Sequence, residues 1–375
     1  MPPANHAKLS ASSAHRWLVC PGSVSLSESF ADSPSSAADE GTAAHALCEH
    51  KVKKAMKLRS KRPTSEYDSD EMESCTDDYR DFVMSIFNAE KERCPGTELL
   101  LEQQVDYSNY CPDGFGTCDC IIVSDSVLHI VDFKYGVGVF VEAERNPQMM
   151  LYALGAIGMF SALYDFKDIE MTIFQPRREN VATYKTTVKE LINWAENVVK
   201  PKALEALSDH PSYHPSEDAC RWCRASAVCR ARAERNMSML KYEFEMPPTL
   251  LDEEIPEILS QANHLKKWLA DVEAYALDAA IHGKQWEGFK VVHGRSRTVV
   301  KDEEAVAKAC HEAGYDDIYN KKMIGLTEMK KLLGKEVYKE RIEPLTEKKP
   351  GSLTLVPDSD RRKAVEILDE FKEEK

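Results

Sequence analysis

Two neighbouring β-like segments, residues 116–124 (GTCDCIIVS) and 127–134 (VLHIVDFK), most constrain how this chain can fold. Only the polar pair Asp125–Ser126 separates them, which predicts a tight hairpin. The first segment contains Asp119 and the second contains Asp132, although aspartate is unfavourable in strands. The two aspartates lie about equally far from the turn, so the hairpin places them opposite each other. A role other than folding is therefore expected for both.

Strand alternation places Asp132 and Lys134 on one face of the sheet and Phe133 on the other. Two adjacent carboxylates repel each other unless a cation lies between them. Hard oxygen ligands on a rigid sheet suit Mg²⁺ or Mn²⁺, and a nearby lysine can orient a water or help to deprotonate it. This combination suits metal-assisted hydrolysis of phosphodiesters. The alternative is a plain surface ion pair, but the apolar residues around Asp132 predict burial, where an unpaired charge is costly.

The rest of residues 1–236 predicts an α/β fold in which a mixed sheet is flanked by helices. Residues 146–160 form the strongest helix candidate, with Asn146 as N-cap and Pro147 in the first position. The other expected elements are helices at 41–58, about 77–91 and 188–204, and strands at 97–105 and 168–176.

Residues 237–375 are expected to form a second, mostly α-helical accessory domain. Residues 250–283 predict a long amphipathic helix that ends at Gly283. A β-hairpin is expected at 286–300, followed by short helices, the last near 358–373.

Composition limits the classes of protein that need to be considered. The chain has 375 residues, of which 43% are hydrophobic, so it can form a substantial core. Its formal net charge of −14 argues against a protein that coats nucleic acid through bulk charge. No apolar run is long enough for a transmembrane helix, and the first residues do not form a secretory signal, so no membrane association and a cytoplasmic location are expected.

Three of the eleven cysteines lie close together near residue 225, as Cys220-x2-Cys223-x5-Cys229. In a reducing compartment such spacing is typical of a metal or cluster site rather than of a disulfide. A Cys₄ zinc site and ordinary core thiols are the alternatives. A fourth ligand is missing nearby, and Cys20 is far away in the sequence.

Three motifs in order give the chain a more specific resemblance: Gly116-x-x-Asp119, Asp132-x-Lys134 and Gln148-x3-Tyr152. Residues 10–235 resemble the PD-(D/E)XK nuclease superfamily in its RecB-like branch, which includes CRISPR-associated exonucleases. They also resemble an uncharacterised phage-encoded family within that superfamily. The resemblance implies a restriction-endonuclease-like sheet.

The resemblance also implies roles for individual residues. The metal ligands would be Asp119, Asp132, the backbone carbonyl of Phe133, and His45 on an early helix. Lys134 would position the attacking water, and Gln148 and Tyr152 would order the site or contact DNA. Glu49 could assist the metal or pair with Lys53, and Glu102 is a weaker candidate for an outer carboxylate.

Iron–sulfur nucleases of this branch use one early and three late cysteines. The resemblance therefore implies that Cys20, Cys220, Cys223 and Cys229 hold a 4Fe–4S cluster, which would tie the ends of the nuclease domain together. Zinc remains the alternative.

A basic stretch follows the helix that carries His45, and it is a candidate phosphate-binding surface or simply a solvated helix face. Its members are Lys51, Lys53, Lys54, Lys57, Arg59, Lys61 and Arg62.

The leading hypothesis is thus a Mg²⁺- or Mn²⁺-dependent deoxyribonuclease, expected to be an exonuclease in phage recombination or DNA processing. DNA and a single-strand-binding or annealing protein are the candidate partners, and the host cytoplasm is the expected location. The alternatives are a catalytically inactive DNA-binding or assembly protein with the same fold, and a zinc-stapled interaction module.

Overall fold

The computed structural model describes residues 7–30, 36–238, 252–292, 303–312 and 325–346. It divides into two compact units, Met1–Asp278 and Ala279–Lys375. The domain boundary expected after residue 236 stays a prediction.

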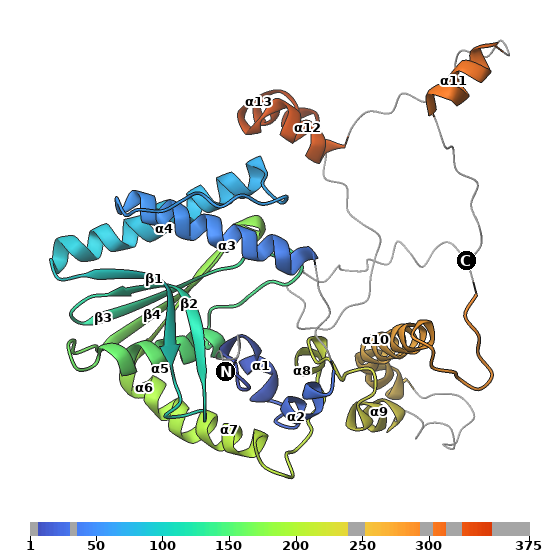
Figure 1. The fold of residues 1–375 in the computed structure, drawn as a ribbon, viewed down its shortest axis with the longest axis horizontal. Helices are drawn as coiled ribbons and strands as arrows, with labels where there is room; N and C mark the ends of the chain where they lie inside the picture. The colour runs from blue at the N-terminus through green and yellow to red at the C-terminus, as the bar shows by residue number, and fades with distance from the viewer. Residues whose placement is uncertain (1–6, 31–35, 239–251, 293–302, 313–324, 347–375) are drawn as a thin grey trace. The chain divides into compact units, whose positions relative to one another are not determined.

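A five-stranded mixed sheet forms the centre of the first unit (Figure 1). Its strands lie in the order β1-β2-β3-β4-β5. Only β3 and β4 are parallel, and the other neighbours are antiparallel. The helix between β3 and β4 therefore crosses over one face of the sheet, and the expected α/β class is confirmed. The strands are β1 (Glu98–Asp106), β2 (Phe115–Val123), β3 (Val127–Phe133), β4 (Asp168–Gln175) and β5 (Asn180–Thr187).

Helices cover both faces of the sheet, so the central strands are buried on both sides. The crossover helix α5 (Pro147–Phe160) packs on one face, and α3 (Ser36–Ala55) and α4 (Asp70–Arg93) pack on the other (Figure 1). Each face of the sheet packs against its helices through a separate apolar cluster, and alternate residues of β3 belong to the two clusters. Leu128 and Ile130 face α5, and Val131 and Phe133 face α3 and α4. Apolar residues are consequently continuous along β2 and β3 rather than alternating with polar ones.

The start of α5 follows from its capping sequence. The Asn146 side chain accepts hydrogen bonds from the backbone N–H groups of Gln148 and Met149, and Pro147 occupies the first turn. The helix is apolar on nearly every side because it lies under the sheet and is flanked by other helices. Both the helix and its cap are confirmed as expected.

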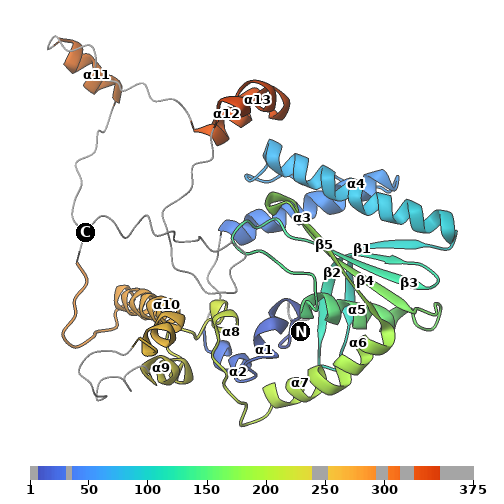
Figure 2. The same ribbon diagram turned by 180° about the vertical axis from the view of Figure 1, so that it is seen from behind.

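The N-terminal segment packs beside helices that come much later in the sequence of the first unit (Figure 2). Helix α1 contacts α5, α7 and α8, so it lies between the sheet and α8. The segment comprises η1 (Ala11–Ser13), α1 (Ala14–Trp17) and α2 (Ser23–Glu28), and the late helices are α8 (Glu217–Arg221) and α9 (Arg230–Met237).

The elements after β4 differ from expectation in one strand. β5 was not expected, and a 3₁₀ turn, η2 (Pro176–Arg178), joins it to β4. The helix expected at 188–204 is present as α6 (Val188–Trp194), a π-helical turn η3 (Ala195–Val199) and α7 (Lys200–Ala206).

The C-terminal region is helical where the structure describes it. The long helix α10 (Glu254–Ile281) is present, and Gly283 follows it with a φ of 97°, as expected of a helix end. Residues 286–292 contain no strand, and the rest of the expected hairpin and the helix near 358–373 lie outside the described residues. The remaining elements are α11 (Glu303–Glu312), α12 (Leu326–Leu333), α13 (Lys335–Arg341) and η5 (Glu343–Leu345).

None of the helices in the described ranges is both long and apolar enough to cross a membrane.

Candidate metal centre

The pairing of β2 with β3 brings the two aspartates together. The antiparallel register pairs Cys120 with Val131, so the next opposed pair is Asp119 and Asp132. The backbone N–H of Phe133 donates to Asp119 Oδ2 at 2.7 Å. The Phe133 ring packs in the core beneath α3 and α4, which fixes this strand end. The hairpin geometry expected from the sequence is therefore present.

Asp132, Lys134 and Gln148 form a closed polar ring. Lys134 Nζ lies 2.8 Å from Asp132 Oδ2 and donates to Gln148 Oε1 at 3.3 Å. Gln148 Nε2 donates to Asp132 Oδ1 at 3.1 Å. Each member thus orients the other two, and only 1% of the Asp132 surface is exposed.

Tyr152 extends this ring by one helical turn of α5. Gln148 Nε2 also donates to Tyr152 Oη at 3.2 Å. The Tyr152 ring lies directly against Gly116, where a Cβ atom would come within 2.8 Å of it. The glycine that opens the first motif is therefore required for the close approach of the tyrosine.

His45 joins the site from α3 through Asp119. Its Nδ1 lies 3.3 Å from Asp119 Oδ1, and its ring meets the Phe133 ring edge-on at 5.4 Å between centroids. Burial lowers the pKa of His45, but the charges of Asp119 and Asp132 outweigh burial and raise it to about 9. Burial likewise opposes a low pKa for Asp119, and the nearby His45 overcomes it and lowers that pKa.

Asp132 responds in the opposite direction. Burial raises its pKa, and the neighbouring charge of Asp119 adds to this, while Lys134 opposes both. The two carboxylates are therefore in electrostatic conflict, which a bound cation would relieve. The donor set of two carboxylates and an imidazole fits a divalent cation on this ground.

Glu102 belongs to the site more closely than the sequence indicates. It lies in β1 opposite Asp119, between the paired residues Leu101 and Gln103. In the described part of the chain, one set of three side chains has potential ligand atoms all within 4.8 Å of one another, namely His45, Glu102 and Asp119. Loss of solvent and the charge of Asp119 raise the pKa of Glu102 to about 7.

The backbone of Glu102 is unusual, with a φ of 49°. A left-handed conformation is uncommon for a residue other than glycine and costs free energy, so it is often found at functional sites. An acidic residue in the middle of a strand next to the Asp119 strand is the signal that could have ranked Glu102 higher.

Glu49 forms an ion pair with Lys53, one of its two alternatives from the sequence. Its charge also contributes to raising the pKa of Glu102, which places it near the site without making it a ligand.

The structure places all four candidate cluster cysteines in one region. Cys20 follows α1, and Cys220 lies in the last turn of α8. Cys223 lies in the loop after α8, and Cys229 is the N-cap residue of α9. The Cys20 sulfur accepts from His214 N at 3.3 Å, and Ser27 Oγ lies 3.7 Å from the Cys223 sulfur. Burial chiefly raises the pKa of Cys20, and the charges of Cys223 and Cys229 add to it. The early and late cysteines are therefore electrostatic neighbours.

Several residues of the basic stretch have structural partners. Lys51 is buried and lies 2.8 Å from Glu73 and 3.0 Å from Asp77 on α4. Arg62 also pairs with Glu73. Lys54, Lys57, Arg59 and Lys61 are exposed. The candidate phosphate-binding surface is thus narrower than the sequence suggests.

These features define an α/β protein with a mixed sheet and an acidic, lysine-containing site where the pairing of β2 with β3 ends. The chain belongs to the family described as protein of unknown function DUF2800, which it matches over residues 6–363.

A solved structure described as "Crystal structure of SSO0001" is similar at 13% identity, over 49% of this chain and 95% of that chain. Its TM-score of 0.21 does not establish a shared fold.

Proposed function

We propose that the protein is a metal-dependent deoxyribonuclease of the PD-(D/E)XK type, acting as an exonuclease in phage recombination or DNA processing. The observation that carries the proposal is the meeting of Asp119, Asp132 and Lys134 where the pairing of β2 with β3 ends. Such a site unites two oxygen ligands with a fixed cation, as metal-assisted phosphodiester hydrolysis needs.

Asp119 and Asp132 would hold the divalent cation, with His45 and Glu102 on the side of Asp119. The ion would act as a Lewis acid on the phosphate and lower the pKa of a bound water. His45 must lose its proton before it can act as a ligand, so cation binding should release protons. The role of the Phe133 carbonyl stays a prediction.

Lys134 would orient the attacking water. In the metal-free protein, burial lowers the pKa of Lys134, but Asp132 and Asp119 outweigh burial and raise it. The contacts of Lys134 with Asp132 and Gln148 fix the ammonium group. A fixed ammonium group can donate to a water and balance charge on the phosphate.

We propose Cys20, Cys220, Cys223 and Cys229 as ligands of a 4Fe–4S cluster. The nearness of the early cysteine to two of the late ones supports this proposal, because the charges of Cys223 and Cys229 act on the Cys20 thiol. A cubane cluster binds four thiolates, one on each iron. A Cys₄ zinc site is the alternative.

An inactive DNA-binding or assembly protein is the second candidate, and one observation favours it. Lys134 Nζ already lies 2.8 Å from Asp132 Oδ2 and neutralises its charge without a metal ion. In that case the site would serve only to hold β2 and β3 together.

End-labelled single- and double-stranded DNA, incubated with Mg²⁺ or Mn²⁺, tests the proposal. The wild-type protein should release mononucleotides, and Asp132→Ala and Lys134→Ala should not. Asp168→Asn, which removes an exposed carboxylate at the start of β4, is the matched control and should stay active. Equal DNA binding by all variants without any cleavage would favour the inactive alternative. Cleavage of closed circular DNA would replace the exonuclease with an endonuclease.

A further inference from the structure

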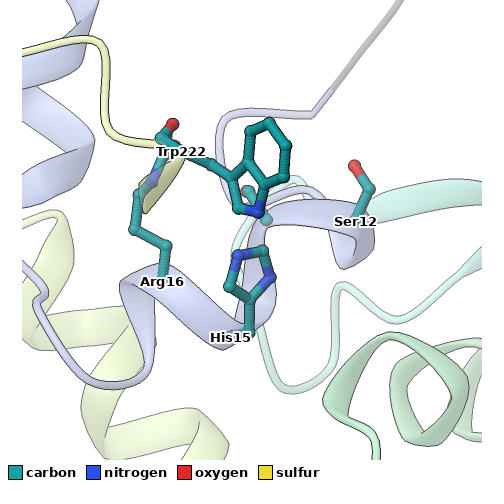
Figure 3. A pocket seen from close by; sticks show the side chains of 5 residues that line it. Ser12, His15, Arg16 and Trp222 are labelled. Carbon is teal, nitrogen blue, oxygen red and sulfur yellow. The ribbon is translucent and has the colours of Figure 1, made fainter. Parts of the chain in front are cut away.

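A pocket lies beside α1, outside the metal centre, where the N-terminal segment meets the loop after α8 (Figure 3). Its volume is about 260 Å³, and it is lined by Ser12, Ser13, His15, Arg16 and Trp222. A neighbouring hollow of about 370 Å³ shares several of these residues and adds Lys8, Ser27 and Arg224. The two form a partly open depression lined by aromatic rings, hydroxyl groups and cations.

Trp222 is the most unusual residue of the pocket because its side chain is large, apolar and 58% exposed. The backbone around it is fixed, since Arg16 Nη1 donates to the Trp222 carbonyl at 3.1 Å. Cys220 and Cys223, which flank it, belong to the cluster region. An exposed indole on a fixed backbone provides a flat surface for stacking.

His15 adds a polar group to the same space. Figure 3 shows its imidazole beside the Trp222 indole, with the Ser12 hydroxyl beyond. His15 Nε2 is buried and has no hydrogen-bond partner within the described residues. Burial, and next the charge of Arg16, lowers the pKa of His15, which favours a neutral ring. Arg221 acts in the same direction, whereas Asp218 opposes it.

Cations outnumber acidic groups around the depression. Arg16, Arg224 and Lys8 line it, and Glu28 is the acidic residue that does so, paired with Lys8 at 2.7 Å. Guanidinium groups suit phosphate oxygens, because they are planar, weakly hydrated donors.

The pocket is connected to the metal centre through η1. Ser12 and Ser13 line the pocket, and Ala11 next to them packs near Gly116 and the ring of Tyr152. Tyr152 in turn contacts Gln148, which binds Asp132. A single short segment therefore borders both sites.

We propose that this pocket binds one unpaired nucleotide of the DNA strand that the metal centre cuts. The base stacks on Trp222, its edge meets His15 and Ser12, and Arg16 and Arg224 contact the phosphate. The inference rests on the proposed function and adds to it a preference for single-stranded DNA. Stacking on an exposed aromatic ring is the usual source of such a preference.

Binding of fluorescently labelled oligothymidine to the full chain, measured by anisotropy without divalent cations, tests the pocket separately from cleavage. Trp222→Ala should weaken binding about tenfold, the scale of one lost stacking contact. Trp222→Phe keeps an aromatic face and should retain most of the affinity. Trp286→Ala, which removes a tryptophan from the second compact unit, should bind as wild type. Duplex DNA should bind equally to all four proteins.

Three outcomes would overturn the inference: unchanged affinity of Trp222→Ala, equal losses for single-stranded and duplex DNA, or a loss in Trp222→Phe as large as in Trp222→Ala. Thymidine monophosphate as competitor separates a nucleotide pocket within a DNA track from a site for free nucleotides. Weak competition supports the proposal, and competition as strong as that of the oligonucleotide contradicts it.

Cleavage of bis(p-nitrophenyl) phosphate, a phosphodiester without a nucleobase, is measured in parallel. Retained cleavage in Trp222→Ala with unchanged DNA binding would refute the pocket alone. Single-strand binding that depends on Trp222, without any metal-dependent cleavage, would refute the nuclease alone.

Discussion

At the scale of single residues, the site depends on charges that are buried together. Asp132 is almost completely buried, and Lys134 is its neutralising partner. Removing one member of a buried pair leaves an uncompensated charge, which is more harmful than replacing both. The residues that would do the chemistry therefore also carry local stability.

Replacing Lys134 with methionine should separate these two contributions. We expect the metal-free variant to lose about 3 kcal/mol of unfolding free energy, because Asp132 is left without a cation. Mn²⁺ should restore most of the loss, since a bound ion neutralises the same carboxylate. Urea unfolding with and without Mn²⁺ measures both effects. An equally destabilised variant in Mn²⁺ would show that no ion binds at Asp132.

Glu102 provides a second prediction at this scale. Glu102→Gln should weaken Mn²⁺ binding about tenfold, because it removes a charge beside Asp119 while keeping the size of the side chain. Glu98→Gln, an exposed change in the same strand, is the control and should have no effect. Calorimetric titration gives both affinities. Unchanged Mn²⁺ affinity in Glu102→Gln would show that Glu102 does not take part in cation binding and that its left-handed backbone has no role in it.

At the scale of elements, α3 and α4 hold His45 in place. The buried Lys51 of α3 contacts Glu73 and Asp77 of α4, and Arg62 of the connecting loop contacts Glu73 as well. The Arg62 and Lys51 hydrogen bonds lower the pKa of Glu73 from 4.5 to about 2. Glu73 is thus the centre of the polar contacts between the two helices.

This lowered pKa predicts a defined pH dependence. A carboxylate with a depressed pKa stabilises the folded state above its ordinary pKa, and this contribution is lost as the pH falls toward the depressed value. Stability should therefore fall between about pH 4.5 and pH 2, and Glu73→Gln should flatten this part of the profile. Urea midpoints measured across this range test the prediction. Glu92→Gln, an exposed change on the same helix, should keep the wild-type slope.

The elements also show which features a sequence can predict. The β2–β3 hairpin and α5 were predictable because a short polar turn, strand alternation and an Asn-Pro cap are local signals. β5 was missed because its residues are mostly polar and lie at the edge of the sheet, where burial leaves little pattern. The burial of Lys51 was missed as well, because it depends on where α4 packs.

Some features of the candidate site can be predicted from the sequence, and others become visible only in the fold. The opposition of Asp119 and Asp132 follows from counting residues from the turn. The position of Glu102 depends on a left-handed backbone in β1, and the residue types there do not predict that conformation. The pocket at Trp222 depends on the meeting of two segments about 200 residues apart, so it became visible only in the fold.

At the scale of the whole molecule, the N-terminal segment and the α8–α9 region come from the beginning and the end of the sheet domain in sequence, and they pack against each other. Cys20 lies in the first segment, and Cys220, Cys223 and Cys229 lie in the second. A cluster held by all four would close a loop of about 200 residues, which restricts the unfolded chain far more than a local contact does.

Cys223→Ser should accordingly act far from the metal centre. We expect loss of iron from the protein and of its visible absorption, because one of four thiolates is gone. Hydrogen exchange should increase in η1, α1 and α2 and stay unchanged in β2 and β3. Cys111→Ser, a buried cysteine outside the region, should keep the iron. Stoichiometric zinc in place of iron in the wild-type protein would contradict the cluster assignment.

The central claim is that one divalent cation lies between the carboxylates of Asp119 and Asp132. Anomalous diffraction from crystals of the protein soaked in Mn²⁺ tests it most directly. We predict a manganese peak at bonding distance from both carboxylates, with His45 beside it and the Lys134 ammonium close by. Bound manganese elsewhere and none at these two aspartates, or two carboxylates that point away from each other, would contradict the account.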